Sequence, residues 1–430
     1  MARSKIAAGI DVGSSKVTVL MAQADEETGA LSVLGAAPVS SRGVRKGQVV
    51  KIEEAVEAIV EAVEAAERMA GYNLETAFVS VTGAHIESQN SRGVVAISDP
   101  DGEITYEDVL RVIEAAKAVS LPSSREIIHV LPREFIVDGE AGIKDPVGMT
   151  GVRLEVETHI VTGSTSALKN LEKCVAEVGV EVGGIVFSGV AAAEAVLSET
   201  EKELGVVLVD IGGGTTSIAV FSEGALSYSA VLPIGARNVT SDLAIGLRVS
   251  MESSEKIKLA LSKEGVKGEG KEEGEGKGDE LDLGRLGVNP EEAKVVSRKT
   301  LVEGIIRPRM NELFTMVGMK LKESGFAGMT PAGVVVTGGG AMTVGVVDSA
   351  KRMLSLPVRV GEPKGVTGLV DEIMTPEFAV PVGLLKYAAE RGGRSMGGGL
   401  KAKGIGKSLD KFQVKGVVGR IGELLKSLLP

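Results

Sequence analysis

The chain is poor in the residues that build disulfides, metal clusters and aromatic cores. Its 430 residues include no tryptophan, one cysteine, three histidines and only 3% aromatic residues. A single cysteine excludes an internal disulfide and fits a reducing cytoplasm. Cys174 lies in an amphipathic stretch with no histidine near it in sequence, so we expect a core residue and not a nucleophile. The histidines stand singly in strand-like runs, which disfavours a metal cluster.

Long apolar runs and an excess of basic charge are also missing. No run approaches the length of a membrane-spanning helix, and Asp11 interrupts the N-terminal apolar run, which argues against a signal peptide. The net charge of −10 and the absence of a basic face with interleaved aromatics argue against nucleic-acid binding. What remains is a glycine-rich α/β composition, long enough for two domains with their own cores.

The central feature is a strand–turn–strand pattern at residues 206–221. Four apolar residues end in Asp210, a glycine turn follows, and a second apolar run begins at Ile218. Backbone N–H groups in such a turn can approach a phosphate closely, hydroxyls can add donors, and the aspartate can hold Mg²⁺ through its water shell. The candidate phosphate-binding residues are Gly212, Gly213, Gly214, Thr215 and Thr216. A glycine hairpin with an incidental aspartate is the alternative for this stretch alone.

The same pattern occurs near the N-terminus. Asp11 ends an apolar run and corresponds to Asp210, and a second apolar run follows the turn. The turn offers Gly13, Ser14, Ser15 and Lys16 to a phosphate. A third glycine turn, Gly338, Gly339, Gly340 and Ala341, follows the strand-like run 333–337 and precedes a predicted helix at 343–354. This repetition predicts two related halves that face each other across one ligand.

Several helix boundaries can also be predicted. An apolar stripe predicts a helix over 51–70 that ends at Gly71. Thr105 and Asp108 have the spacing of a capping box. A helix over 290–324, kinked at Pro308, is expected after a Gly/Lys/Glu-rich tract at 263–284 that reads as a flexible surface loop.

The C-terminal end has linker composition at 391–411, followed by a basic amphipathic pattern at 412–430. Such a helix can lie in a membrane interface, and docking on its own domain or on a partner is the alternative. The apolar positions that would enter the membrane are Phe412, Val417, Val418, Ile421, Leu424, Leu425 and Leu428.

Two Asp-x-Gly hairpins with a late glycine turn resemble the actin-like ATPase superfamily. Within it the chain resembles the FtsA family of bacterial cell-division proteins over about residues 6–390 and the tail helix. The runs that carry this resemblance are Asn90–Ile97, Ile128–Gly139, Asp145–Gly151, Arg153–Val156, Asn238–Arg248 and Glu255–Lys258.

The resemblance implies an α/β, two-lobed actin-like fold with duplicated, ribonuclease-H-like cores. Residues 1–83 with 163–205 would form the core of the first lobe, and 84–162 an inserted, family-specific subdomain. Residues 206–254 with 331–390 would form the core of the second lobe, and 255–330 its smaller subdomain. The linker and the C-terminal amphipathic helix complete the expected fold.

The resemblance also implies ATP and Mg²⁺ between the lobes. Asp11 and Asp210 would hold the metal, Glu255 and Lys258 the ribose side, and residues 338–341 the adenosine. Relatives usually carry Asp at the position of Ser217. Superfamily members with strong ATPase activity place an acid or amide where this chain has Ser188, and Glu194 is a weak substitute. We therefore expect a slow ATPase at most.

The partners implied are the C-terminal peptide of the tubulin-like protein FtsZ, further copies of the chain in an actin-like filament, and an anionic membrane surface. Arg298 and Glu303 match the peptide-binding motif. The implied location is the cytoplasmic side of the cell membrane at the division site. A PilM-like pilus-assembly adaptor and a sugar-kinase-type phosphotransferase are the alternative functions.

Overall fold

The computed structural model describes residues 5–25, 28–99, 101–265, 279–286, 295–369 and 373–392. It forms two compact units. The larger unit contains residues up to 89, 121–129 and 161 onward, and the smaller contains 90–120 and 130–160. The predicted membrane helix and nearly all of the predicted linker lie outside the described residues. Within the described part, no helix is long and apolar enough to cross a membrane.

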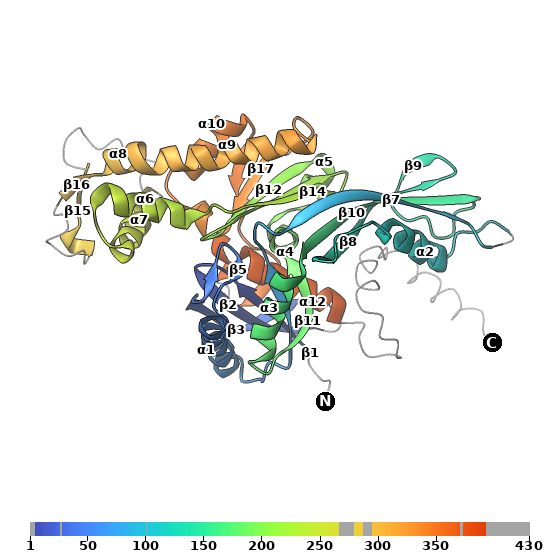
Figure 1. The fold of residues 1–430 in the computed structure, drawn as a ribbon, viewed down its shortest axis with the longest axis horizontal. Coiled ribbons are helices and arrows are strands. Elements are labelled where there is room, and N and C mark those ends of the chain that lie inside the picture. The colour runs from blue at the N-terminus through green and yellow to red at the C-terminus, as the bar shows by residue number, and fades with distance from the viewer. Residues whose placement is uncertain are drawn as a thin grey trace. The chain divides into compact units, whose positions relative to one another are not determined.

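The larger unit is built on two sheets (Figure 1). The first contains β1 (Lys5–Val12), β2 (Lys16–Ala24), β3 (Leu31–Ser40), β6 (Thr76–Val81), β11 (Glu181–Phe187) and β19 (Val366–Gly368). The second contains β12 (Val206–Ile211), β13 (Thr216–Ser222), β14 (Ala225–Leu232), β17 (Val334–Thr337) and β18 (Val358–Val360).

The two sheets repeat one topology, which confirms the predicted duplication. The first runs in the order β11-β6-β1-β2-β3, with β19 added at its edge, and the second in the order β18-β17-β12-β13-β14. In each sheet the first three of these strands are parallel and the last two are joined to them by antiparallel pairs. The fold class is therefore the expected actin-like arrangement of duplicated cores.

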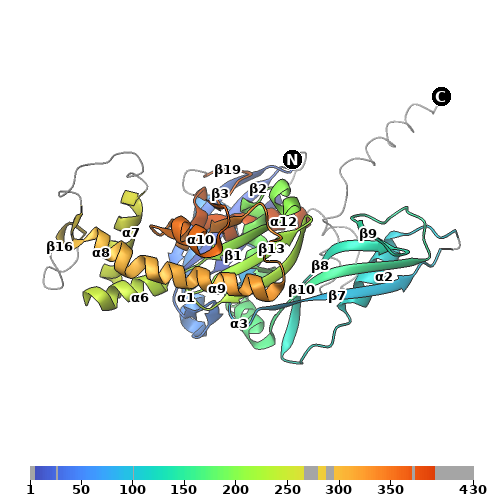
Figure 2. The same cartoon turned by 90° about the horizontal axis from the view of Figure 1, so that it is seen from above.

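Helices that pack on these sheets are α1 (Ile52–Ala70), α3 (Thr165–Ala176), α4 (Ser188–Val196), α5 (Glu199–Leu204), α9 (Arg307–Ser324), α10 (Val346–Leu354) and α12 (Ala379–Gly392). Helices α6 (Ala236–Leu247), α7 (Met251–Gly265) and α8 (Arg298–Leu301) lie together at one end of the larger unit (Figure 1). Helix α9 runs across the molecule beside the second sheet (Figure 2). Short elements are β4 (Val44–Arg45), β5 (Gln48–Val49), β15 (Glu280–Asp282), β16 (Val295–Ser297), three 3₁₀ turns (Gly284–Leu286, Gly339–Met342, Pro376–Phe378) and a π-helical turn (Val302–Ile306).

Local signals placed several ends correctly. Helix α1 ends at Gly71, whose φ of 72° lies in the left-handed region that glycine adopts freely. Thr105 and Asp108 form the expected capping box at the start of α2 (Tyr106–Lys117). Cys174 is buried in α3, as a core residue should be.

Two other predictions were wrong in part. The long helix begins at Arg298 and not at 290, because residues 295–297 form a strand. Pro308 sits at the start of α9, directly after the π-helical turn. Proline has no N–H to offer the carbonyl four residues earlier, and the wider turn accommodates that loss. The 263–284 tract is ordered at both ends, in α7 and in β15.

The smaller unit contains α2 and most of a four-stranded sheet in the order β7-β10-β8-β9. Its strands are β7 (Glu87–Ala96), β8 (Arg125–Val137), β9 (Glu140–Ile143) and β10 (Arg153–Ser164). Its histidine is structural. His159 is buried, its Nδ1 lies 2.7 Å from Asn90 Oδ1, and burial lowers its pKa to about 3, helped by the charge of Arg133.

Candidate functional site

The two Asp-x-Gly stretches form the same tight turn. Gly13 N–H donates to the carbonyl of Lys16 at 3.0 Å, and Gly212 N–H donates to the carbonyl of Thr215 at 2.9 Å. In each case the turn joins the first two strands, along the chain, of one of the two related sheets: β1 to β2 in the first sheet and β12 to β13 in the second. Both pairs are antiparallel. The sequence similarity of the two stretches therefore corresponds to equal positions in the duplicated fold.

The two hairpins also meet. A Cβ atom on Gly213 would lie 2.5 Å from Ser15 Oγ, and one on Gly214 would lie 2.9 Å from Ser14 Oγ. Only glycine permits this approach, because real Cβ atoms do not come so close to another heavy atom. The fold thus brings together the two glycine turns, 199 residues apart in sequence at Gly13 and Gly212 (212 − 13).

Asp11 and Asp210 occupy matching places at the ends of β1 and β12. Asp11 pairs with Thr18 on β2, and Asp210 pairs with Ser217 on β13. Burial raises the pKa of Asp11, against the effects of a 2.5 Å hydrogen bond from Ser80 Oγ and of the nearby Lys16 charge. Burial also raises the pKa of Asp210 to about 7, and the charge of Asp11 adds to this effect.

Two neighbouring carboxylates that repel each other, Asp210 buried and Asp11 half-buried, suit a divalent cation. Among the described residues, no group of three or more His, Cys, Asp or Glu side chains could hold a metal by itself. Mg²⁺ is commonly held by one or two carboxylates together with water and substrate phosphates. The pair Asp11 and Asp210, beside two phosphate-sized glycine turns, fits that donor set.

The third glycine turn touches this centre. Gly338 has a φ of 81°, and a Cβ atom there would lie 2.3 Å from Asp210 Oδ1. A Cβ on Gly340 would lie 2.2 Å from Ile211 Cγ2. The predicted adenosine loop therefore packs directly against the strand that ends in Asp210.

Glu255 and Lys258 form a cluster with Thr240, a residue that the sequence did not single out. Lys258 Nζ donates to Glu255 Oε2 at 2.8 Å and to Thr240 Oγ1 at 3.1 Å, and Thr240 donates to Glu255 at 2.6 Å. Thr240 lies on α6 and the other two on α7. Gly235, just before α6, was also missed: a Cβ atom there would lie 2.5 Å from the carbonyl oxygen of Gly212.

Not every predicted donor points to a ligand. Thr216 is fully buried and its hydroxyl donates to the carbonyl of Ile234, just after β14, at 2.8 Å. In this structure the Thr216 hydroxyl is therefore not presented to a phosphate. Ser14 Oγ accepts from Gly47 N–H at 2.9 Å, which leaves its own proton able to donate. Ser15 is exposed.

Ser188, at the predicted water-positioning place, belongs to a chain of hydroxyls. Ser188 Oγ lies 2.8 Å from Ser217 Oγ, which lies 3.0 Å from Thr82 Oγ1. Glu194 lies further along α4 and pairs with Lys202 at 3.7 Å. That ion pair gives Glu194 a structural partner and weakens it as a substitute for a catalytic acid.

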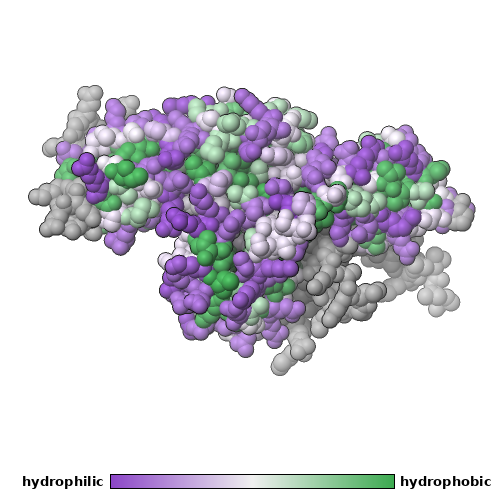
Figure 3. Space-filling view, in the orientation of Figure 1, coloured by the Kyte–Doolittle hydropathy of each residue, from purple (hydrophilic) through white to green (hydrophobic). Residues whose placement is uncertain are grey.

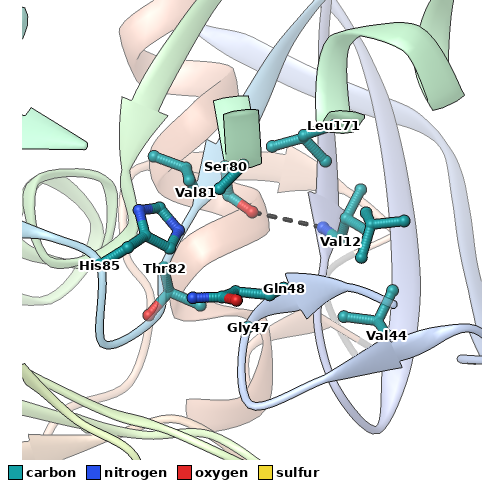
Figure 4. A pocket seen from close by; sticks show the side chains of 11 residues that line it. Val12, Val44, Gly47, Gln48, Ser80, Val81, Thr82, His85 and Leu171 are labelled. Atoms are coloured by element: carbon teal, nitrogen blue, oxygen red, sulfur yellow. Dashed lines mark hydrogen bonds between the residues drawn. The ribbon is translucent and has the colours of Figure 1, made fainter. Parts of the chain in front are cut away.

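A small cavity lies next to the first hairpin. Val12, Gln48, Ser80, Thr82 and His85 are among the residues that line it, and Ser80 points its hydroxyl at Val12 N (Figure 4). Its volume of about 10 Å³ is at the lower limit for one water molecule. The cavity is too small for a nucleotide, so the candidate ligand site is the meeting point of the three glycine turns.

The predicted peptide site lies around the π-helical turn. Arg298 begins α8, and Glu303 is exposed on the π turn, where it pairs with Arg307. A hollow of about 260 Å³ beside it is lined by Asp242, Gly304, Ile305, Pro308, Arg309 and Glu312. Hydrophobic residues are visible among hydrophilic ones over this end of the larger unit (Figure 3), and Ile245 of α6 is 74% exposed.

Comparison with protein families gives two matches. A family model described as "Cell division protein FtsA" matches residues 207–383, and one described as "SHS2 domain inserted in FTSA" matches residues 83–162. The curated protein "Cell division protein FtsA" of Pseudomonas aeruginosa is 40% identical over 411 residues, which cover 95% of this chain and 94% of that protein.

Solved structures share the fold at low identity. The chain titled "PilM-PilN type IV pilus biogenesis complex" gives a TM-score of 0.62 at 13% identity, covering 89% of this chain and 98% of that one. MreB 5 of Spiroplasma citri bound to AMPPNP gives a TM-score of 0.50 at 14% identity, covering 88% of this chain and 94% of that one. Both are evidence for the actin-like fold alone.

Proposed function

Because the chain belongs to the FtsA family of cell-division proteins, we propose that it is an ATP-binding, actin-like adaptor that links the FtsZ ring to the cell membrane. The observation that carries the nucleotide part of this proposal is the contact between two matching glycine hairpins, each with an aspartate at its strand end whose pKa burial raises. Membership of this family favours the cell-division adaptor over the pilus-assembly and sugar-kinase alternatives. Neither alternative is supported by a separate observation.

ATP would lie with its phosphates at the two hairpins and its adenosine at residues 338–341. Backbone N–H groups of the turns and the hydroxyls of Ser14 and Ser15 would bind phosphate oxygens. Asp11 and Asp210 would hold Mg²⁺, which supplies positive charge against the phosphates. The fold shared with an AMPPNP-bound MreB supports nucleotide binding. The Thr240–Glu255–Lys258 cluster offers polar atoms to the ribose.

Turnover of this nucleotide should be slow. Ser188 and Ser217 hydrogen-bond to each other, and a hydroxyl is a much weaker proton acceptor than a carboxylate at neutral pH. The nucleotide therefore acts mainly as a structural ligand. We expect less than about one phosphate released per minute, well under the usual range of kinases. Multiple-turnover phosphate release at chaperone-like rates that is abolished in Asp210→Ala would overturn this expectation.

The FtsZ peptide would bind near the π-helical turn. Glu303 and the adjoining hollow are accessible, and Arg298 begins the neighbouring helix. Arg309 is held in the wall of the hollow by Asp242, at 2.5 and 2.9 Å. The wall of the hollow combines apolar Ile305 and Pro308 with the held guanidinium of Arg309, which suits a short peptide that carries both apolar and acidic residues. Residues 412–430 would anchor the complex, and self-assembly into filaments would gather many anchors on one membrane.

Co-sedimentation with anionic liposomes tests the adaptor role. The full chain with ATP and Mg²⁺ should pellet with the liposomes and bring a labelled FtsZ C-terminal peptide with it. A chain that ends at Lys411 should leave both in the supernatant, because the amphipathic segment has been removed. Pelleting of the truncated chain with liposomes, or of the full chain without the peptide, would contradict the proposal. A lipid-free sample with ATP separates membrane binding from sedimentation of filaments.

A further inference from the structure

Lys16 of the first phosphate hairpin already has an anionic partner. Its Nζ lies 2.9 Å from Glu377 Oε2, and it stands 4.3 Å from the centre of the Phe378 ring. Lys16 and Glu377 are separated by 361 positions in sequence. Their side chains are 25% and 38% exposed, so a ligand can reach this ion pair.

The segment that carries Glu377 also contacts the third glycine turn. The carbonyl of Pro376 accepts the Gly338 N–H at 3.0 Å and the Thr337 hydroxyl at 3.3 Å. A Cβ atom on Gly339 would lie 3.7 Å from Glu377 Cβ. One 3₁₀ turn, Pro376–Phe378, therefore touches both the Lys16 hairpin and the glycine turn beside Asp210.

The ammonium group of a lysine carries a single positive charge, and two anions that contact it compete for it. Lys16 ends the hairpin turn to which the proposed function assigns the phosphates, so a bound phosphate and the Glu377 carboxylate would compete for the same ammonium group. A phosphate that draws Lys16 away leaves Glu377 without its partner and close to added negative charge, which opposes binding.

We propose that the Glu377 carboxylate competes with a bound phosphate for the Lys16 ammonium group and thereby lowers the affinity of the site for a nucleoside triphosphate. This inference rests on the proposed nucleotide-binding function. Glu377 acts through Lys16 and is a positioning residue. The arrangement keeps the triphosphate exchangeable at a site whose glycine turns would otherwise hold it tightly, and it links phosphate binding to the turn that begins α12.

Equilibrium titration of the full chain with ATP and with AMP, both with Mg²⁺, tests this. Glu377→Gln keeps the shape and removes the charge, and it should tighten ATP binding by about threefold to tenfold. AMP binding should stay within about twofold, because AMP does not carry the outer phosphates. Glu57→Gln, an exposed glutamate on α1, removes the same charge elsewhere and should change neither affinity.

A second pair of variants isolates the role of Lys16. In a Lys16→Met background, Glu377→Gln should tighten ATP binding by less than half of its effect in the natural chain, because the competition has been removed. An unchanged or weaker ATP affinity in Glu377→Gln, an equal shift for AMP, or an undiminished effect in the Lys16→Met background would overturn the inference. If the natural chain binds no ATP, the proposed nucleotide function fails together with the inference. If it binds ATP but the variants do not behave as expected, the inference alone fails.

Discussion

A Gly383→Ala substitution is expected to disrupt the centre of the larger unit. Gly383 lies on α12, where an added Cβ atom would sit 1.7 Å from the carbonyl oxygen of Ala191 on α4 and 2.4 Å from its carbon. The obstacle is backbone, which cannot rotate away as a side chain can. Helix α4 is buried along almost its whole length and packs on strands of both sheets, so neither helix has room to move.

We expect this substitution to cost about 3 kcal/mol or more, at the upper end for overpacking. The thermal midpoint of unfolding should fall by about 5 °C or more, with a lower soluble yield. Gly304→Ala is the matched control: Gly304 is also helical, but nothing lies within 4 Å of its added Cβ atom. The control should be neutral or slightly stabilising, since alanine favours helices. Equal thermal midpoints for the two variants would show that the helices do not cross as closely as described.

Gly338→Ala should strongly weaken nucleotide binding while leaving the fold intact. The added Cβ atom would lie 2.3 Å from Asp210 Oδ1 and 2.6 Å from the carbonyl oxygen of Ile211. The Asp210 carboxylate must then move from its place opposite Asp11, and the glycine turn must shift away from β12. We expect the affinity for ATP with Mg²⁺ to fall by about 100-fold, which corresponds to roughly 2.7 kcal/mol.

A control is needed because Gly338 also has a φ of 81°, which an alanine tolerates poorly. Gly345 has a φ of 76° with nothing within 4 Å of an added Cβ atom, so Gly345→Ala carries the backbone cost without the collision. Both variants should lose about 1 kcal/mol of stability from the left-handed conformation. Only Gly338→Ala should lose ATP binding, and a similar loss in both would attribute the effect to backbone strain.

The parts of the site that the sequence predicted are those with a local signal. A buried strand, an aspartate, glycines and a second strand follow one another within residues 206–221, and the repetition of this pattern predicted two related halves. The meeting of Gly213 with Ser15 followed from that symmetry. The end of α1 at Gly71 and the capping box at Thr105 are local in the same sense.

The residues that were missed depend on long-range pairing. Ser80 reaches Asp11 because β6 runs parallel to β1, 69 positions away in sequence. Glu377 meets Lys16 across 361 positions, and no pattern around either residue indicates the other. Thr216 looked like a phosphate donor because the sequence does not show that its hydroxyl faces Ile234 on the returning chain.

At Pro308 the sequence predicted a kink, and the structure has an irregular helical turn directly before this residue. The sequence marks the proline but not how its missing hydrogen bond is absorbed, and the structure absorbs it in the π-helical turn that precedes α9. The same turn carries Glu303 and borders the hollow assigned to the peptide. A local irregularity of the helix and a candidate binding surface thus coincide near the proline that the sequence marked.

The central claim is that the two hairpins hold ATP through a cation shared by Asp11 and Asp210. Equilibrium titration of the natural chain with ATP, once with Mg²⁺ and once with EDTA, tests this arrangement most directly. We expect saturable ATP binding with Mg²⁺ and an affinity at least about tenfold lower in EDTA, because the two neighbouring carboxylates then repel the phosphates and each other. Equal affinity in both buffers, or no binding in either, would contradict it.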